Sequence, residues 1–217
     1  EDLFMHLHYW DPHGPLSPPP EWIDRGYEPD TSAVTDEQLT RLAASPLYRG
    51  GRHTGVRSRR ELAELLRLYD AEIRYTDHLV GQMCAYLKKR GWYDDCAVIL
   101  SADHGEQYGE GQMILEHGTV HDSCIHIPML LKLPGGAHRG EVCAHPVYGL
   151  DIAPAAARFF GVAAPEMWHG TALQDTLDGT AAPREYLVCE HGLYTCQRAV
   201  LQDGWKMVHN KRGIAGA

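Results

Sequence analysis

An acid and a histidine stand side by side at the end of an apolar run in this sequence. Asp103 and His104 follow Cys96–Ala102, a run typical of a buried parallel strand, and Gly105 comes next. Side chains no longer alternate strictly where a strand ends, so a carboxylate and an imidazole on adjacent residues can reach one cation. The carboxylate is a hard oxygen ligand, whereas the imidazole suits zinc or manganese better than calcium. The same residues also fit a plain strand-to-loop turn, in which Asp103 caps and Gly105 supplies a positive φ.

Two further histidines could act with this pair. His13 lies in a loop held by Pro12 and Pro15, and such a rigid position suits a histidine that points at a substrate oxygen as donor or general acid. An exposed loop histidine would fit the same pattern. His117 precedes a glycine in the polar segment LEHGTVHDSC, which is either a surface loop or a helical turn that places His117 and His121 on one face.

The segments around these residues predict an α/β domain. Apolar side chains recur at three- and four-residue steps from residue 58 to residue 90, which predicts a long amphipathic helix, and Gly91 gives a stop signal. Apolar runs predict strands at Leu3–Trp10, Cys96–Ala102 and Ile127–Gly135, and a helix is predicted at Leu150–Gly161. This order favours a mostly parallel sheet flanked by helices. Ligands of such sheets lie beyond the carboxyl ends of the strands, where Asp11–His13 and Asp103–His104 both stand.

The last part of the chain has a different pattern. The runs at residues 186–190 and 198–209 alternate between apolar and polar side chains, and Asp203-Gly204 is a strong signal for a type I′ hairpin. We therefore expect residues 1–183 to form the α/β domain and residues 184–217 to begin a small C-terminal antiparallel sheet.

The region from residue 24 to residue 58 is polar and rich in glycine, which predicts loops. One short helix is predicted at Thr35–Ser45, where Thr35 and Gln38 make a capping box. Because loops placed near a site often select the substrate, this region is a candidate for specificity.

Composition limits the partners. The hydrophobic content of 44% and the charged content of 23% are those of a soluble globular protein. A net charge of −9 argues against a general nucleic-acid binder but leaves anionic small-molecule substrates open. The six cysteines show no C-x-x-C pair and no zinc-ligand spacing, which favours reduced thiols. No apolar stretch approaches the roughly 20 residues of a membrane span.

Taken together and in order, these segments resemble the C-terminal half of a type I sulfatase, in the alkaline-phosphatase-like superfamily. The resemblance is carried by HYWDPHGPLSPP, by residues 69–106, and by YGEGQMILEHGTVHDSCIHIPMLLKLPGG, VYGLDIAPAAARFFGV and RAVLQDGWKMVH. The Asp-His-Gly-Glu block followed by His-Gly and Ile-Pro is fairly specific to the superfamily. The Asp-Pro-His-x-Pro loop narrows the resemblance toward sulfatases. It covers nearly all of the chain except residues 24–58.

The resemblance implies a role for each candidate residue. Asp103 and His104 would be ligands of a divalent metal, usually calcium; many sulfatases have Asn at the position of His104, so manganese is the alternative. His13 would contact the sulfate or the leaving-group side of the nucleophile. His117 would bind the ester oxygens, in a place where the family has Lys or His, and no lysine occurs between Gly105 and Ile127. The implied substrate is a small-molecule sulfate ester, with sulfated carbohydrates as one class.

The nucleophile half of such a site is not expected in this sequence. Sulfatases use a formylglycine made from Cys or Ser in a C-x-P-x-R-type motif, and none of the six cysteines begins one. Both ends of the sequence also look like cuts. We therefore expect a fragment that supplies part of the metal and sulfate site and is inactive on its own.

Two other functions fit the residues. One is a phosphodiesterase or phosphonate monoester hydrolase of the same superfamily, in which an Asp-His metal pair is also usual. The other is a folding or binding module with no catalysis of its own. On the tail, Glu190 and His191 are candidates to reach a sugar-like leaving group, whereas Arg198, Trp205 and Lys206 are expected at a structural edge of the small sheet.

Overall fold

The computed structural model describes residues 2–44, 55–110, 114–192 and 196–210. Its helices in chain order are η1 (Pro20–Trp22), α1 (Asp36–Ala43), α2 (Arg59–Lys89), α3 (Asp122–Ile125), η4 (Pro134–Gly136), η5 (Gly149–Asp151), α4 (Ile152–Phe159) and α5 (Leu173–Leu177). Its strands are β1 (Val98–Ser101), β2 (Gln107–Tyr108), β3 (Ile114–Glu116), β4 (Met129–Lys132), β5 (Leu187–His191), β6 (Gln197–Gln202) and β7 (Trp205–Asn210). No helix in these ranges is long and apolar enough to cross a membrane.

Helix α2 is the long helix that the apolar periodicity predicts. It begins after Ser58, whose side chain accepts the Glu61 amide while the Glu61 carboxylate accepts the Ser58 amide. It ends at Lys89 with Arg90 as its C-cap, and Gly91 follows with a φ of 71°. The predicted capping box of the short helix α1, between Thr35 and Gln38, is also present.

The two central strands pair antiparallel, whereas a mostly parallel sheet is predicted. Val98 of β1 lies opposite Lys132 of β4, and Ser101 lies opposite Met129. A parallel pair requires a crossover of a dozen or more residues, usually through a helix on the sheet face. The described part of the segment between β1 and β4 contains the β2–β3 pair and no helix longer than the single turn of α3, and the chain turns back instead. The predicted strand Leu3–Trp10 is extended but forms no ladder with another part of the described chain.

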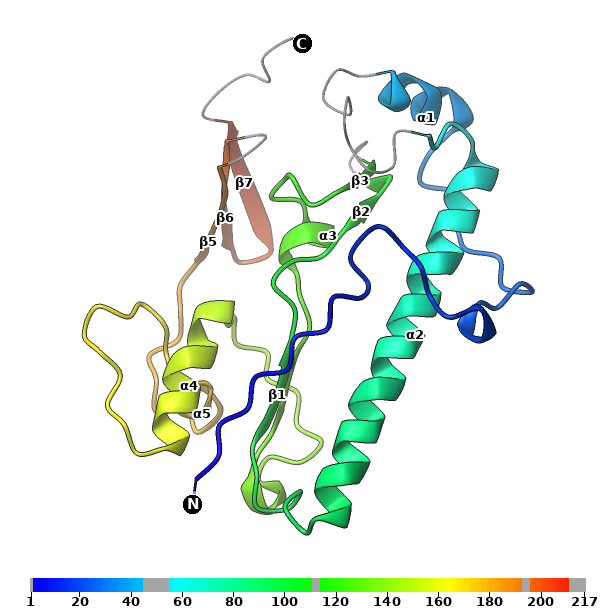
Figure 1. Cartoon of the computed structure of the whole chain (residues 1–217). Helices are drawn as coiled ribbons and strands as arrows, with labels where there is room; N and C mark the ends of the chain where they lie inside the picture. Colours follow the sequence, from blue (N-terminus) through cyan, green and yellow to red (C-terminus); the bar gives the residue numbers. More distant parts are fainter. Residues whose placement is uncertain (1, 45–54, 111–113, 193–195, 211–217) are drawn as a thin grey trace.

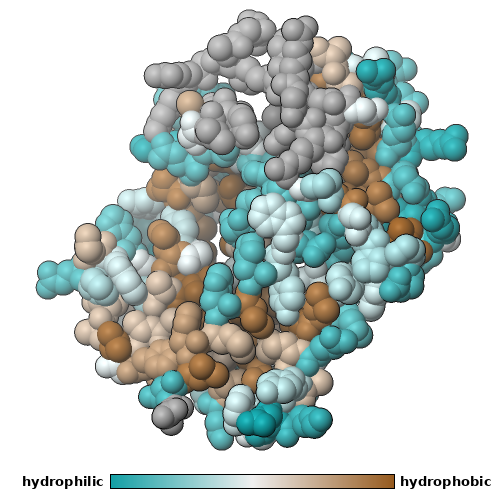
Figure 2. Space-filling view, in the orientation of Figure 1, coloured by the Kyte–Doolittle hydropathy of each residue, from teal (hydrophilic) through white to brown (hydrophobic). Residues whose placement is uncertain are grey.

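The long helix and the shorter helices lie on either side of the central strands. In Figure 1, β1 lies between α2 on the right and α4 with α5 on the left, and β5, β6 and β7 form a separate sheet above α4. Helices on both sides of strands confirm the predicted α/β class. Apolar side chains gather in the lower half of the face shown in Figure 2, and the exposed apolar residues include Leu3, Phe4 and Met5 of the N-terminal segment.

A buried hydrophobic cluster joins α1, α2 and β2. Val34, Leu39, Leu62 and Tyr108 form it, and Tyr69 packs against it from α2. Their contacts fix the start of the β2–β3 hairpin against the long helix.

The C-terminal sheet has the order β5-β6-β7, with both pairs antiparallel. Its β6–β7 turn is the predicted hairpin: Asp203 and Gly204 have φ values of 49° and 78°, both positive as a type I′ turn requires. Ala199 of β6 is fully buried, whereas Arg198 beside it is exposed. One face of this sheet therefore packs against the rest of the chain.

Candidate functional site

The structure brings the three predicted histidines together. The imidazole rings of His104 and His117 stack with their centroids 3.8 Å apart and an interplanar angle of 25°. The ring centroid of His13 lies 6.3 Å from that of His104 and 6.1 Å from that of His117. The three residues come from the loop before η1, the turn after β1 and the segment after β3. The fold thus assembles the cluster from distant parts of the sequence.

The turn that ends β1 orients His104. Its Nδ1 lies 2.9 Å from the carbonyl oxygen of Gly105; Nδ1 therefore carries the proton, and Nε2 is the nitrogen that can bind a cation. The Gly105 amide donates to the Cys124 carbonyl over 2.8 Å, and a Cβ on Gly105 would lie 2.0 Å from the carbonyl oxygen of Ser123. Gly105 is required by this close approach of α3 and not by the positive φ expected of a turn residue, because its φ lies outside that region.

The carboxylate of Asp103 lies beside Nε2 of His104. Its Oδ1 accepts the His104 amide over 3.0 Å, and its Oδ2 is 3.7 Å from His104 Nε2. The Asp103 side chain is 81% exposed, so ligands from outside the described residues can also reach it. Both expected uses of Asp103, as a cap and as a cation ligand, are compatible with this position.

Glu106 is a site residue that the sequence reasoning missed. Its Oε2 lies 3.3 Å from His117 Nδ1, and its side chain is 16% exposed. Single ligand atoms of His104, Glu106 and His117 all lie within 4.8 Å of one another. Two imidazoles and a carboxylate are ligands that zinc, manganese and iron favour, whereas calcium prefers oxygen. The signal was in the sequence, since Glu106 completes the Asp-His-Gly-Glu block.

A buried polar network holds the segment that carries His117. The fully buried Gln107 donates from Nε2 to the Glu110 carbonyl over 2.8 Å, and its Oε1 accepts from Thr119 Oγ1 over 2.7 Å. Thr119 Oγ1 in turn accepts the His121 amide over 3.1 Å. Satisfied buried networks of this kind fix one conformation, because breaking them leaves unpaired polar groups. They hold His117 in place relative to β2.

Two tyrosines, with their rings tilted at 54° to each other, lie near Glu106. The rings of Tyr69 and Tyr108 are 4.7 Å apart. Burial, followed by the negative charge of Glu106, raises the pKa of Tyr69 to about 12. Burial is also the main cause that raises the pKa of Tyr108, with smaller contributions from Tyr69 and Glu106. Both phenols therefore stay protonated, and they form an uncharged wall on this side of the carboxylate.

The loop with His13 is tied to the long helix. His13 Nδ1 lies 2.7 Å from the carbonyl oxygen of Gly14, and the His13 amide donates to the Trp10 carbonyl over 2.9 Å. Further along the loop, the Ser17 amide donates to Glu72 of α2 over 2.5 Å. Glu72 is 1% exposed, and burial is the main cause that raises the pKa of its carboxyl. This contact sets where the loop crosses α2.

Glu190 and His191, the two candidate residues on the tail, lie in different surroundings. Glu190 is exposed and its Oε2 accepts from Arg198 over 3.0 Å, on the outside of the C-terminal sheet. His191 is half-buried, and its pKa is lowered mainly by burial and secondly by the charge of His117. His191 is therefore within electrostatic reach of the histidine cluster.

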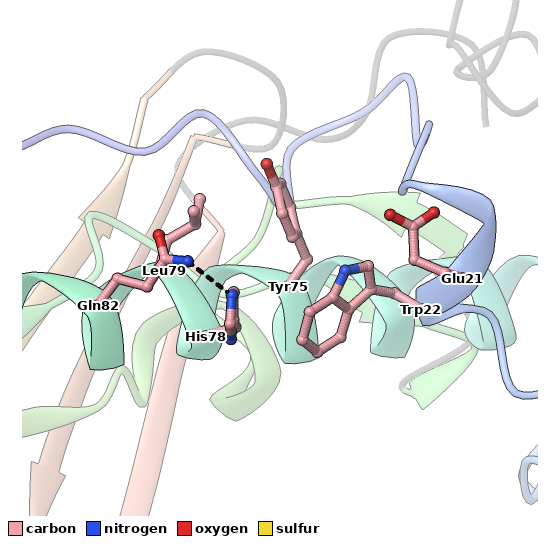
Figure 3. A pocket seen from close by; sticks show the side chains of 6 residues that line it. All are labelled: Glu21, Trp22, Tyr75, His78, Leu79 and Gln82. Atoms are coloured by element: carbon pink, nitrogen blue, oxygen red, sulfur yellow. Dashed lines mark hydrogen bonds between the residues drawn. The ribbon is translucent and has the colours of Figure 1, made fainter.

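A separate hollow of about 520 Å³ lies between η1 and α2. Figure 3 shows its lining, which consists of Glu21, Trp22, Tyr75, His78, Leu79 and Gln82. It shares none of these residues with the histidine cluster and is not part of the site.

Comparisons with known proteins identify a matching family model and several similar proteins. The family model described as Sulfatase matches residues 1–162. The multifunctional alkaline phosphatase superfamily protein PehA of Trinickia caryophylli is 26% identical over 189 residues, which are 79% of this chain and 36% of that protein. An N-acetylglucosamine-6-O-sulfatase of Bacteroides thetaiotaomicron is 24% identical over 115 residues, which are 53% of this chain and 20% of that protein.

A solved structure shares the fold. The phosphonate monoester hydrolase of Agrobacterium radiobacter matches with a TM-score of 0.73 and 21% identity, over 92% of this chain and 47% of that one. The chain therefore spans less than half the length of each of these three proteins.

Proposed function

The chain belongs to the sulfatase family, and we propose that it supplies part of the active site of a sulfuric ester hydrolase. The observation that carries the proposal is the convergence of His13, His104 and His117 from three distant segments onto one cluster. Donors gathered in this way suit an ester group whose oxygens carry charge.

Asp103 and His104 would hold a divalent cation. The 3.7 Å between Asp103 Oδ2 and His104 Nε2 allows one ion to meet both atoms, and Glu106 offers a further carboxylate nearby. Calcium, the metal that the resemblance implies, takes six or more oxygens, so it would need further carboxylates from outside the described residues. The imidazole of His104 suits manganese better than calcium. When bound, either cation would stabilise negative charge on the ester oxygens.

His117 and His13 would then bind the ester. The Glu106 carboxylate, 3.3 Å from Nδ1, orients the ring of His117, and the Gly14 carbonyl orients that of His13. Rings held in this way lose little freedom when they donate hydrogen bonds to the oxygens of the transition state, which is the condition for effective stabilisation.

The nucleophile would come from residues outside this sequence. None of the six cysteines begins a C-x-P-x-R motif, so the formylglycine that the resemblance implies has no source here. The chain alone should bind a cation and an anion but should not turn over an ester.

A phosphodiesterase or phosphonate monoester hydrolase is the second candidate. It is favoured by the fold shared with the Agrobacterium radiobacter enzyme. A sulfate ester of a carbohydrate is the substrate class we prefer, since the likeness to the N-acetylglucosamine-6-O-sulfatase supports it.

The test is metal-dependent ester cleavage by the full-length natural protein. We expect sulfate release from an aryl sulfate to require manganese or calcium and to fall by at least about 100-fold in Asp103→Ala. Asp95→Ala, an exposed aspartate shortly before β1, is the matched control and should keep full activity. Equal rates of sulfate release with and without a chelator would contradict the assignment of a metal site.

A further inference from the structure

His191 lies on the face of the C-terminal sheet that contacts residues 120–122, shortly after His117 in the chain. In the β5–β6 pair His191 stands directly opposite Gln197, and residues in such positions project to the same face of a sheet. The Oε1 of Gln197 accepts the amide of Val120 over 3.1 Å, and Val120 lies three positions after His117. The side chain of His191 is therefore directed toward the segment that carries His117.

A second contact fixes the same face. Lys206 of β7 stands opposite Leu201 of β6, and Leu201 is four positions after Gln197 and so shares its face. The Nζ of Lys206 lies 2.8 Å from Oδ1 of Asp122 at the start of α3. Contacts from two strands thus hold this face of the sheet against residues 120–122.

Glu190 belongs to the other face. It stands opposite Arg198, and the two side chains form an exposed ion pair with 3.0 Å between Nη2 and Oε2. Neighbouring residues on a strand point to opposite sides, so a histidine that faces the site requires Glu190 to face away from it. Glu190 therefore offers a control on the same strand.

The position of His191 differs from that of the other histidines. His13, His104 and His117 form ring contacts among themselves, and all three come from segments before α3. His191 arrives from the C-terminal sheet, on the side of His117. If the three clustered rings meet the charged ester group, a side chain that enters from this second sheet meets the part of the substrate beyond the ester oxygen.

We propose, building on the function proposed above, that His191 contacts the alcohol part of the ester and selects alcohols with hydroxyl groups near the ester oxygen, as in a sugar. A neutral imidazole can both donate and accept a hydrogen bond, and a hydroxyl group can satisfy either nitrogen. A flat aryl alcohol without hydroxyl groups would gain nothing from this contact. The C-terminal sheet then contributes to specificity, and the contacts of Gln197 with Val120 and of Lys206 with Asp122 hold it next to the site.

The test compares two sulfate esters in the full-length natural protein. His191→Ala should raise KM for a monosaccharide sulfate by about tenfold, as expected for one lost hydrogen bond, and should leave kcat/KM for para-nitrophenyl sulfate within about twofold. His191→Gln, which keeps a donor and an acceptor, should recover part of the loss. Glu190→Ala should match the natural protein with both substrates.

Each other outcome counts against the inference. An equal loss with both esters would place His191 in the ester-binding cluster, and no loss with either would remove it from the site; both overturn the inference and leave the proposed function standing. If the natural protein turns over neither ester while it is folded and metal-loaded, the proposed function fails and the inference falls with it.

Discussion

The ring of His117 stacks on the ring of His104 at 3.8 Å, although the two are thirteen positions apart in the sequence. The β2–β3 hairpin and the buried contacts of Gln107 return the chain to the end of β1 and make this stack possible. Because Glu106, two positions after His104, contacts His117, the segment from residue 104 to residue 117 supplies two imidazoles and a carboxylate to a common point.

Substitution of the clustered histidines should give non-additive losses. His117→Ala and His13→Ala should each lower kcat/KM for an aryl sulfate by about 100-fold or more, and the double variant should lose less than the product of the two. Groups that bind one ester together account for this result. Steady-state kinetics on the four proteins measure it.

His78→Ala serves as the control for these variants. His78 is exposed on α2 and bonds to Gln82, away from the cluster, so its removal should leave kcat/KM unchanged. Fully additive losses for His13 and His117 would mean that the two residues act on different steps or at different places.

Glu106→Gln should weaken the binding of both manganese and calcium. The carboxylate orients His117 and stands among the nearby ligand atoms, and loss of such a partner typically lowers metal affinity by about 10- to 100-fold. Isothermal titration of the full-length protein with each cation measures the two affinities. An unchanged manganese affinity would remove Glu106 from the metal site.

Gly105→Ala should destabilise the protein severely. The added Cβ would lie 2.0 Å from a backbone oxygen of Ser123, which cannot move without displacing α3, and we expect a loss of about 2 to 4 kcal/mol in the free energy of unfolding. Thermal unfolding followed by circular dichroism checks this. Gly81→Ala in α2, where nothing lies within 4 Å of the new Cβ, should instead stabilise the protein by about 0.5 to 1 kcal/mol.

Glu72→Gln should change how stability depends on pH. Burial raises the pKa of this carboxyl in the folded state above its unfolded value, so its contribution to stability is full below the unfolded pKa and is lost as pH rises through the folded pKa. The glutamine can still accept the Ser17 amide but carries no charge to desolvate. The variant should therefore equal or exceed the natural protein in stability at neutral pH.

Urea unfolding at several values between about pH 4 and pH 8 tests this prediction. The stability advantage of Glu72→Gln should shrink as pH falls, because the natural carboxyl becomes protonated and its cost disappears. A variant that is less stable at neutral pH would show instead that the charge of Glu72 is needed, and a partner for that charge would have to be sought.

Local signals predicted the elements better than their pairing. The spacing of apolar residues and the Ser58–Glu61 capping box predicted α2, and Asp203-Gly204 predicted the last hairpin, because these signals act within a few residues. The antiparallel pairing of β1 with β4 could not be predicted from two short apolar runs, since such runs do not indicate whether the strands pair parallel or antiparallel. The strand predicted at Leu3–Trp10 pairs with no other described strand. A strand needs a neighbour to pair with, and its own residues do not indicate whether one lies beside it.

The candidate site was predictable only in part. No single histidine was decisive by itself, and it was their order along the chain, through the family resemblance, that pointed to one site. Glu106 had a sequence signal in the Asp-His-Gly-Glu block, but its contact with His117 depends on how the β2–β3 hairpin folds back. The direction of the His191 side chain depends on how the C-terminal sheet approaches the cluster, and short sequence patterns do not encode such approaches.

The most direct test of the central claim is the substrate preference of the full-length natural protein. We would measure kcat/KM for para-nitrophenyl sulfate, para-nitrophenyl phosphate and a phenylphosphonate ester with manganese or calcium present, and repeat the measurement on His104→Ala. The account predicts that the sulfate ester is preferred and that His104→Ala abolishes its turnover. A preference for the phosphoester or the phosphonate would assign the chain to the second candidate function, and a folded, metal-loaded protein that cleaves none of the three would contradict the hydrolase assignment.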